Sequence, residues 1–197
     1  MTKYVLNSGA LKKYPEKGQA FLAEIVKGLG PNPKMLICLF AQAREDWEDK
    51  IGGYKDLMGN APQGVSVSFE LAFPDKFEEQ IKRSDIVYIH GGDDDLLEYR
   101  FSKFDLPKIW EGKVVATSSA GSNLVVKQYW TCDWRVCREG RGVVPIKFIP
   151  HFDSDFGATD PRGPINWQQA YEELKNYGDK SLPIHALEEG DFIVINQ

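Results

Sequence analysis

The segment from Val114 to Gly121 could place a serine for nucleophilic attack. Val114–Ala116 is apolar, as a buried strand would be, and only small residues follow as far as Gly121. A catalytic serine in a sharp strand-to-helix turn needs small neighbours because its backbone is strained, and its hydroxyl is then exposed beside free helix N–H groups. Ser119 is the candidate, since Gly121 follows two residues later as in G-x-S-x-G, although Thr117 replaces the first Gly. An ordinary serine cap on a helix remains the alternative.

A serine nucleophile needs a base, and the chain offers only three histidines. His90 precedes a glycine pair at the end of an apolar strand, and His185 alternates within a late strand, so we expect packing roles for both. His151 follows the apolar Phe148–Pro150 and opens a polar loop. An imidazole in that position could reach across a cleft at the strand ends. His151 is therefore the predicted base.

A triad also needs a carboxylate to orient the imidazole. If it lies between the serine and the histidine or just after them, the candidates are Asp133, Glu139 and Asp153. Asp133 is the first choice, because it lies fourteen residues past Ser119 and could return to the cleft from the end of the elbow helix. A solvated loop aspartate is the alternative.

Gly91 and Gly92 form a second strand-to-helix turn, followed by the aspartates 93–95. Consecutive glycines let the backbone approach a ligand and direct N–H groups at an anion. The N–H groups of Gly92 and Ala120 are therefore candidates for an oxyanion hole, while a plain turn with aspartates at a helix N-terminus is the alternative. The sequence lacks both a G-x-G-x-x-G fingerprint and a P-loop, so we expect no nucleotide cofactor.

Apolar runs and amphipathic stretches alternate along the chain, as strands and helices of an α/β fold do. The predicted strands are Tyr4–Leu6, Met35–Ala41, Val65–Phe69, Ile86–Ile89, Lys113–Thr117, Val143–Ile149 and a closing pair, Ile184–Leu187 with Phe192–Ile195. The predicted helices include Lys17–Leu29, Lys76–Arg83, Ser122–Gln128 and Ile165–Tyr177. This order predicts a three-layer α/β sandwich with a mostly parallel sheet. Ligands bind such sheets beyond the carboxyl ends of the strands, where both glycine-bearing turns fall.

Composition narrows the classes of partner. The 197 residues suit one domain, 1–197, and the formal net charge of −5 without any basic run argues against nucleic acid. The longest apolar run, Met35–Ala41, is far shorter than the roughly 20 residues that cross a bilayer. Three cysteines and no readable secretory leader lead us to expect a cytoplasmic protein. For its oligomeric state, we expect a monomer or a homodimer.

Three short motifs together resemble the S51 family of serine peptidases, which includes dipeptidase E and cyanophycinase. They are Gly91-Gly92-Asp93, Ser119-Ala120-Gly121-Ser122-Asn123-Leu124 and Pro150-His151-Phe152. The resemblance implies a class I glutamine amidotransferase-like sandwich. It also implies Ser119 as nucleophile, His151 as base, an aspartate at or near Asp133 as orienting group, and an oxyanion hole at Gly92 and Ala120.

The resemblance further implies a short peptide substrate, and we expect no cofactor and no metal. Family aspartyl dipeptidases hold the acidic side chain of the substrate with an arginine after the histidine loop, and Arg162 is the nearest match. Asp93 and Asn123 complete the candidate substrate-binding set. The Gly-Gly-Asp form, however, is more similar to cyanophycinase, and aspartates 93–95 could instead hold an amino group or a basic side chain such as that of β-aspartyl-arginine.

Three competing interpretations fit the same residues. An inactive relative could keep the scaffold and bind a ligand. A metal-dependent hydrolase could use the oxygen-rich loop in which Asp153 and Asp155 follow His151, with Asp160 beyond them. An α/β-hydrolase would need a histidine near the chain end, where only His185 is present.

Overall fold

The computed structural model of the chain describes residues 1–59 and 61–197. Its larger sheet has six strands in the order β10-β1-β5-β4-β2-β3, and every neighbouring pair is parallel except β1 with β10. The strands are β1 (Lys3–Asn7), β2 (Lys34–Cys38), β3 (Ser68–Leu71), β4 (Ile86–Ile89), β5 (Val114–Ser118) and β10 (Phe192–Asn196). The predicted mostly parallel α/β fold is therefore confirmed.

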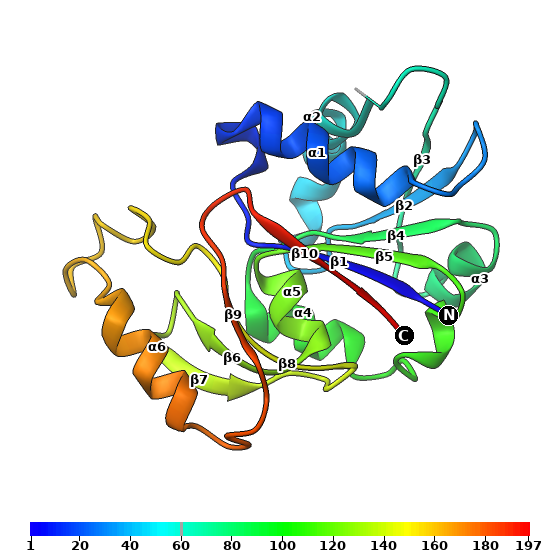
Figure 1. Cartoon of the computed structure of the whole chain (residues 1–197). Helices are drawn as coiled ribbons and strands as arrows, with labels where there is room; N and C mark the ends of the chain where they lie inside the picture. The colour runs from blue at the N-terminus through cyan, green and yellow to red at the C-terminus, as the bar shows by residue number, and fades with distance from the viewer. Residues whose placement is uncertain (60) are drawn as a thin grey trace.

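Helices cover both faces of this sheet (Figure 1). They are α1 (Pro15–Val26), α2 (Trp47–Gly59), α3 (Phe77–Lys82), α4 (Asp94–Phe101) and α5 (Ala120–Val125). The helices α1 and α2 lie on one side, and α4 and α5 lie on the opposite side. Strands β4 and β5 are buried along their whole length, which explains their continuous apolar sequence.

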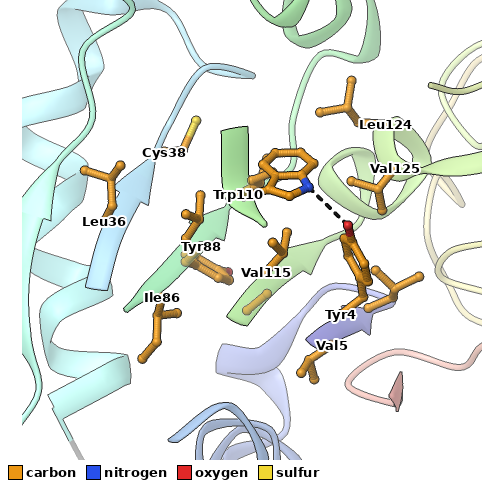
Figure 2. Close-up of a cluster of buried hydrophobic side chains, with 14 of the residues drawn as sticks. Tyr4, Val5, Leu36, Cys38, Ile86, Tyr88, Trp110, Val115, Leu124 and Val125 are labelled. Carbon is orange, nitrogen blue, oxygen red and sulfur yellow. Dashed lines mark hydrogen bonds between the residues drawn. The ribbon is translucent and has the colours of Figure 1, made fainter. Parts of the chain in front are cut away.

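The core of the large sheet is built from aliphatic side chains of the parallel strands and from aromatic residues (Figure 2). Tyr4 and Trp110 are both almost fully buried, and the Trp110 indole N–H donates to the Tyr4 hydroxyl at 3.1 Å. Each polar tip thus satisfies the other inside an apolar surrounding, as buried Tyr and Trp side chains require. Strands β1 and β5 pair in parallel, and their carboxyl ends carry Asn7 and Ser118.

A second sheet of four strands, in the order β7-β6-β8-β9, stands beside the first (Figure 1). Its strands are β6 (Val126–Thr131), β7 (Val136–Glu139), β8 (Val144–Ile149) and β9 (Ile184–Ala186), and helix α6 (Trp167–Asn176) packs on it. Helix α5 lies between β5 and the two central strands of this small sheet. The small sheet is absent from the sequence prediction.

Two local predictions are wrong because of the small sheet. The elbow helix does not run over 122–128; it ends at Val125, and Val126 begins β6, whose Gln128 pairs with Glu139 of β7. The expected closing pair of strands is not a hairpin either. Strand β9 pairs with β8 in the small sheet, whereas β10 pairs with β1 in the large one. The connection 187–191 therefore crosses from one sheet to the other.

Across 1–59 and 61–197, the structure contains no helix that is long and apolar enough to span a membrane.

Candidate active site

Ser119 occupies a strained turn between β5 and α5. Its backbone angles are φ 51° and ψ −116°, in the positive-φ region that residues with side chains rarely adopt. The Ser119 N–H donates to the carbonyl of Asn7 on the neighbouring strand at 3.0 Å, and its carbonyl accepts from the N–H groups of Ser122 and Asn123. The turn has the strand-to-helix geometry predicted for a nucleophile elbow.

Two glycines let the neighbouring turn approach this elbow. A Cβ at Gly91 would lie 2.7 Å from the carbonyl oxygen of Ser118 and 2.9 Å from the Cβ of Ser119, closer than real contacts allow. A Cβ at Gly121 would collide with the carbonyl oxygen of Ile89 at the end of β4. Both positions therefore require glycine for close packing, independently of any ligand.

A buried hydroxyl pair fixes the base of the elbow. Ser122 donates to the carbonyl of Asn7 at 2.8 Å and lies 2.8 Å from the hydroxyl of Thr117, which must then donate to it. Thr117 and Ser122 are fully buried, so these bonds satisfy groups that water cannot reach. Thr117 stands where the G-x-S-x-G pattern has its first glycine, and its hydroxyl contributes a buried hydrogen bond to Ser122.

His151 reaches Ser119 from the small sheet. It follows β8 after Pro150, and its Nε2 lies 3.0 Å from the Ser119 Oγ. The ring stacks on Phe156 with centroids 4.2 Å apart, and Gly9 lies so close that a Cβ there would be 2.5 Å from the His151 Cε1. The backbone N–H of His151 donates to the Ser8 hydroxyl at 2.6 Å. The imidazole is therefore held on several sides with its edge toward the serine.

The carboxylate that contacts His151 is Glu189, not Asp133. The Nδ1 of His151 lies 3.1 Å from Glu189 Oε1, and Glu189 is only 7% exposed. Because a carboxylate only accepts hydrogen bonds, Nδ1 carries the proton and Nε2 is free to accept from the serine. The side chain of Asp133 is close enough for His151 to affect its pKa, but the structure assigns it no hydrogen bond to the imidazole.

Sequence reasoning misses Glu189 because it expects the carboxylate no further along the chain than just beyond the histidine. Glu189 lies 38 residues after His151, in the connection between β9 and β10. One sequence signal points to it: the Glu188-Glu189-Gly190 turn follows a predicted strand, at whose carboxyl end functional groups gather. That signal needs β9 to be parallel to β8, which local sequence does not reveal.

Burial and hydrogen bonding determine the protonation states of His151 and Glu189. Burial lowers the pKa of His151, and the neighbouring Glu189 opposes this without reversing it. For Glu189, burial raises the pKa, but the hydrogen bonds from Lys13 and His151 outweigh that effect and leave the pKa below its usual value. At neutral pH the pair is a neutral imidazole against an ionised carboxylate. In that state the imidazole can accept a proton.

The predicted oxyanion donors, the N–H groups of Ala120 and Gly92, belong to two turns that approach each other closely at Gly91. Ala120 is the first residue of α5, so its N–H has no partner within the helix. The carbonyl of Gly91 accepts from the Gln42 side chain at 2.6 Å. Because the C=O and N–H of a trans peptide point in opposite directions, the Gly92 N–H points away from Gln42.

The three predicted substrate-binding side chains already have partners. Asp93 caps α4 by accepting from the Leu96 N–H at 2.8 Å. Asn123 is 3% exposed and donates to Asp94 at 3.1 Å. The Arg162 side chain is about half exposed and pairs with Asp160.

Asp160 holds the guanidinium of Arg162 by two hydrogen bonds. Its carboxylate accepts from Nε at 2.9 Å and from Nη2 at 2.5 Å. The Arg162 Nη2 also donates to the backbone carbonyl of Asp133 at 2.7 Å. A substrate carboxylate would have to compete with Asp160 at this guanidinium.

A small cavity of about 120 Å³ opens beside the elbow. Ala120 lines it together with Tyr129, Arg138 and several carboxylates. The acidic side chains around the cavity are Asp94, Asp95, Glu98 and Glu139. Burial raises the pKa of Asp94, while Thr131 and Asn123 donate to its carboxylate. Three of these carboxylates pair with cations: Asp95 with Arg138, Glu98 with Arg141 and Glu139 with Lys127.

A metal centre and an α/β-hydrolase triad gain no support from the contacts. Among residues 1–59 and 61–197, no three His, Cys, Asp or Glu side chains come together as a metal site would require. His151 contacts Ser119, whereas His185 lies on β9 in the small sheet. Burial lowers the pKa of His90 to about 4, in keeping with a packed side chain.

Solved structures share this fold. A peptidase from an acI-B1 Actinobacterium is 22% identical and has a TM-score of 0.58, with 99% of this chain and 83% of that chain covered. A candidate peptidase E protein from Listeria monocytogenes EGD-e is 13% identical and has a TM-score of 0.66, with 100% and 99% covered. The fold is peptidase E-like. No protein-family model and no curated protein matches the chain.

Proposed function

We propose that the chain is a serine hydrolase that cleaves short peptides, with Ser119 as nucleophile, His151 as general base and Glu189 as orienting carboxylate. The observation that carries this proposal is the unbroken series of contacts from Ser119 Oγ to His151 Nε2 at 3.0 Å and from His151 Nδ1 to Glu189 at 3.1 Å. Those are the contacts that acyl transfer by an activated serine requires.

The proposed reaction follows from which atoms carry protons. His151 Nε2 accepts the Ser119 proton as the oxygen attacks the peptide carbonyl carbon, and the carbonyl oxygen becomes an oxyanion. The N–H groups of Ala120 and Gly92 stabilise that oxyanion. His151 then gives the proton to the leaving amine, and water hydrolyses the acyl-enzyme by the same steps. Glu189 keeps the proton on Nδ1 and stabilises the imidazolium that forms in each half of the reaction.

The peptide as substrate rests on two supports. The structural neighbours are described as peptidases, and their fold extends over nearly all of this chain. Among short peptides, we propose that the chain cleaves after an N-terminal aspartate. Arg162 would bind the side-chain carboxylate of that aspartate through two hydrogen bonds, in place of Asp160.

The acidic cavity beside Ala120 favours a second candidate substrate. Four carboxylates line it, and the cations Arg138, Arg141 and Lys127 pair with three of them. A cationic group of a substrate could replace one of these cations, whereas an aspartate side chain would face the carboxylates without a partner. A β-aspartyl-arginine dipeptide carries a guanidinium that suits this charge. The alternative function is therefore that of a β-aspartyl peptidase similar to cyanophycinase.

One panel of substrates separates these candidates. Asp-X dipeptides, β-aspartyl-arginine and neutral dipeptides are incubated with the wild type and with Arg162→Ala, and the released amino acids are measured. A preference for Asp-X that disappears in Arg162→Ala supports the aspartyl dipeptidase. Cleavage of β-aspartyl-arginine alone supports the second candidate.

A fluorophosphonate probe tests the nucleophile without a substrate. Labelling that Ser119→Ala abolishes shows that the serine is activated. If the probe does not label the wild type and nothing in the panel is cleaved, the proposed hydrolase is wrong and the chain is an inactive relative.

A further inference from the structure

Glu189 is held by two partners, one on each carboxylate oxygen. Its Oε1 contacts His151, and its Oε2 accepts from the Lys13 ammonium at 2.9 Å. Lys13 ends the short 3-10 helix Leu11–Lys13, which follows β1 at the opposite end of the chain from Glu189. The lysine side chain is 56% exposed, while that of Glu189 is 7% exposed. The ammonium therefore approaches the carboxylate from the solvent side.

We propose that Lys13 is a positioning residue of the catalytic machinery: it holds the Glu189 carboxylate against His151 and places a positive charge on the solvent side of that carboxylate. This inference rests on the proposed function, since it assigns Lys13 a role in the same site. It does not make Lys13 a group that touches substrate.

The first part of the role follows from the geometry of the carboxylate. A glutamate side chain has three rotatable bonds and loses considerable rotamer freedom when it is fixed. The bond from Lys13 fixes Oε2, and this leaves Oε1 directed at His151 Nδ1. Without Lys13, the carboxylate would stay paired with His151 through Oε1, but its second oxygen would no longer be fixed.

A second lysine holds the same loop in a different way. Lys17 donates to the backbone carbonyl of Glu189 at 3.0 Å and pairs with the Asp191 carboxylate at 2.8 Å. Asn7 supports the loop further by donating to the carbonyls of Gly190 and Asp191. The chain thus offers a matched pair: Lys13 contacts the carboxylate of Glu189, and Lys17 contacts only its main chain.

The charges that face the pair decide the sign of the effect. His151 is influenced by the carboxylates of Glu189 and Asp133, which favour its protonation, and by the ammonium of Lys13, which opposes it. Glu189 is influenced by Lys13 and His151, and Lys17 is balanced by Asp191 and Glu188. Removal of the Lys13 charge leaves Glu189 paired with His151 alone. The imidazole should then bind a proton at a higher pH.

The test uses Lys13→Met, with Lys13→Arg as rescue and Lys17→Met as the matched control. The first readout is the titration of His151 followed by NMR of the imidazole, with His151→Gln to assign the signal. It does not require that the protein cleave anything. The second readout is kcat/KM for the best substrate of the panel, or the rate of fluorophosphonate labelling, from about pH 5 to about pH 9, the range in which an imidazole titrates.

We expect the titration midpoint of His151 to move upward in Lys13→Met and to stay in place in Lys13→Arg and Lys17→Met. The rate at pH 6 relative to pH 8 should fall by about threefold in Lys13→Met, the size expected for one partly screened charge near a buried group. Lys17→Met should melt at a lower temperature without changing this ratio.

Unchanged titration in a folded Lys13→Met would overturn the proposal, as would an equal shift in Lys17→Met, since that would indicate a general loosening of the loop. The NMR result separates this inference from the proposed function. A shifted midpoint in a protein that neither cleaves peptides nor reacts with the probe keeps the positioning role and rejects the hydrolase.

Discussion

The two sheets differ in construction, and each supplies one part of the candidate active site. The central strand β5 of the large sheet is buried at all five residues and ends directly before Ser119. In the small sheet the edge strands β7 and β9 are partly exposed, and β8 leads through Pro150 to His151. Glu189 belongs to neither sheet, because it lies in the connection from β9 to β10.

The larger core of the first sheet can hold a strained backbone at Ser119, and the smaller core of the second sheet holds His151. The strained backbone of Ser119 lies against the fully buried hydroxyls of Thr117 and Ser122, where the surrounding core can hold an unfavourable φ. The smaller core under α6 is built on Trp130, Ile149 and Leu174 and carries the histidine. We therefore expect that a change in the small sheet can disturb His151, the proposed base, while Ser119 keeps its conformation.

The largest expected effect comes from removing either half of the Ser119–His151 contact. Ser119→Ala and His151→Gln should each lower kcat/KM by about a thousandfold or more, because triad members act as one unit. The measurement is cleavage of the best substrate of the panel, with thermal melting to show that both variants are folded. A Ser119→Ala protein that retains more than about a tenth of the wild-type rate would contradict the assignment, since triad removal costs far more.

The next effect separates Glu189 from Asp133. Glu189→Gln removes the negative charge and lets an amide N–H face Nδ1, which favours the wrong tautomer, so kcat should fall by about 10²–10⁴. Asp133→Asn should cost less than about tenfold, because its carboxylate makes no hydrogen bond to the imidazole in the structure. The comparison of the two kcat values decides which carboxylate orients His151. A larger loss in Asp133→Asn would assign the orienting role to Asp133.

Local sequence can identify candidate site residues that directly follow a predicted strand. Ser119 is recognisable because small residues follow an apolar strand, and His151 because it opens a polar loop after another strand. Parallel strands that are buried on both faces have continuous apolar sequences, so β4 and β5 are also recognisable. The mostly parallel α/β fold follows from these runs.

The features that local sequence misses depend on pairing between distant segments. The sequence analysis assigns 126–128 to the end of a helix, and pairing with β7 and β8 makes this segment part of the strand β6. The partners of β9 and β10 lie in two different sheets, which no local pattern encodes. Because Glu189 lies between these two strands, its contact with His151 is hidden for the same reason.

Lys147 offers a way to weaken the small sheet. Its side chain is fully buried in β8, and its ammonium donates to the carbonyls of Leu174, Lys175 and Tyr177 at the end of α6. Lys147→Met should lower the free energy of unfolding by about 2–4 kcal/mol, since those carbonyls lose a charged donor. Lys34→Met, at the exposed start of β2, should change it by less than about 0.5 kcal/mol.

Chemical denaturation followed by fluorescence measures both changes. In Lys147→Met, we also expect fluorophosphonate labelling to be lost at a lower denaturant concentration than the one that unfolds the large sheet. The reason is that His151 would be displaced before the large sheet unfolds. Equal stability of Lys147→Met and the wild type would contradict the role of this lysine as the anchor of α6.

The smallest expected effect concerns how kcat/KM decreases at low pH. Burial lowers the pKa of His151 below its ordinary 6.5, so the base stays neutral at pH 6.5 in most molecules. The value of kcat/KM at pH 6.5 should therefore exceed half of its plateau above about pH 8, and it should fall only at lower pH as the imidazole takes up a proton. His90→Gln serves as the control, because it removes a partly buried histidine that directly follows β4, and it should leave the decrease at low pH unchanged. A half-maximal rate above pH 6.5 in the wild type would mean that the attraction of Glu189 outweighs burial at His151.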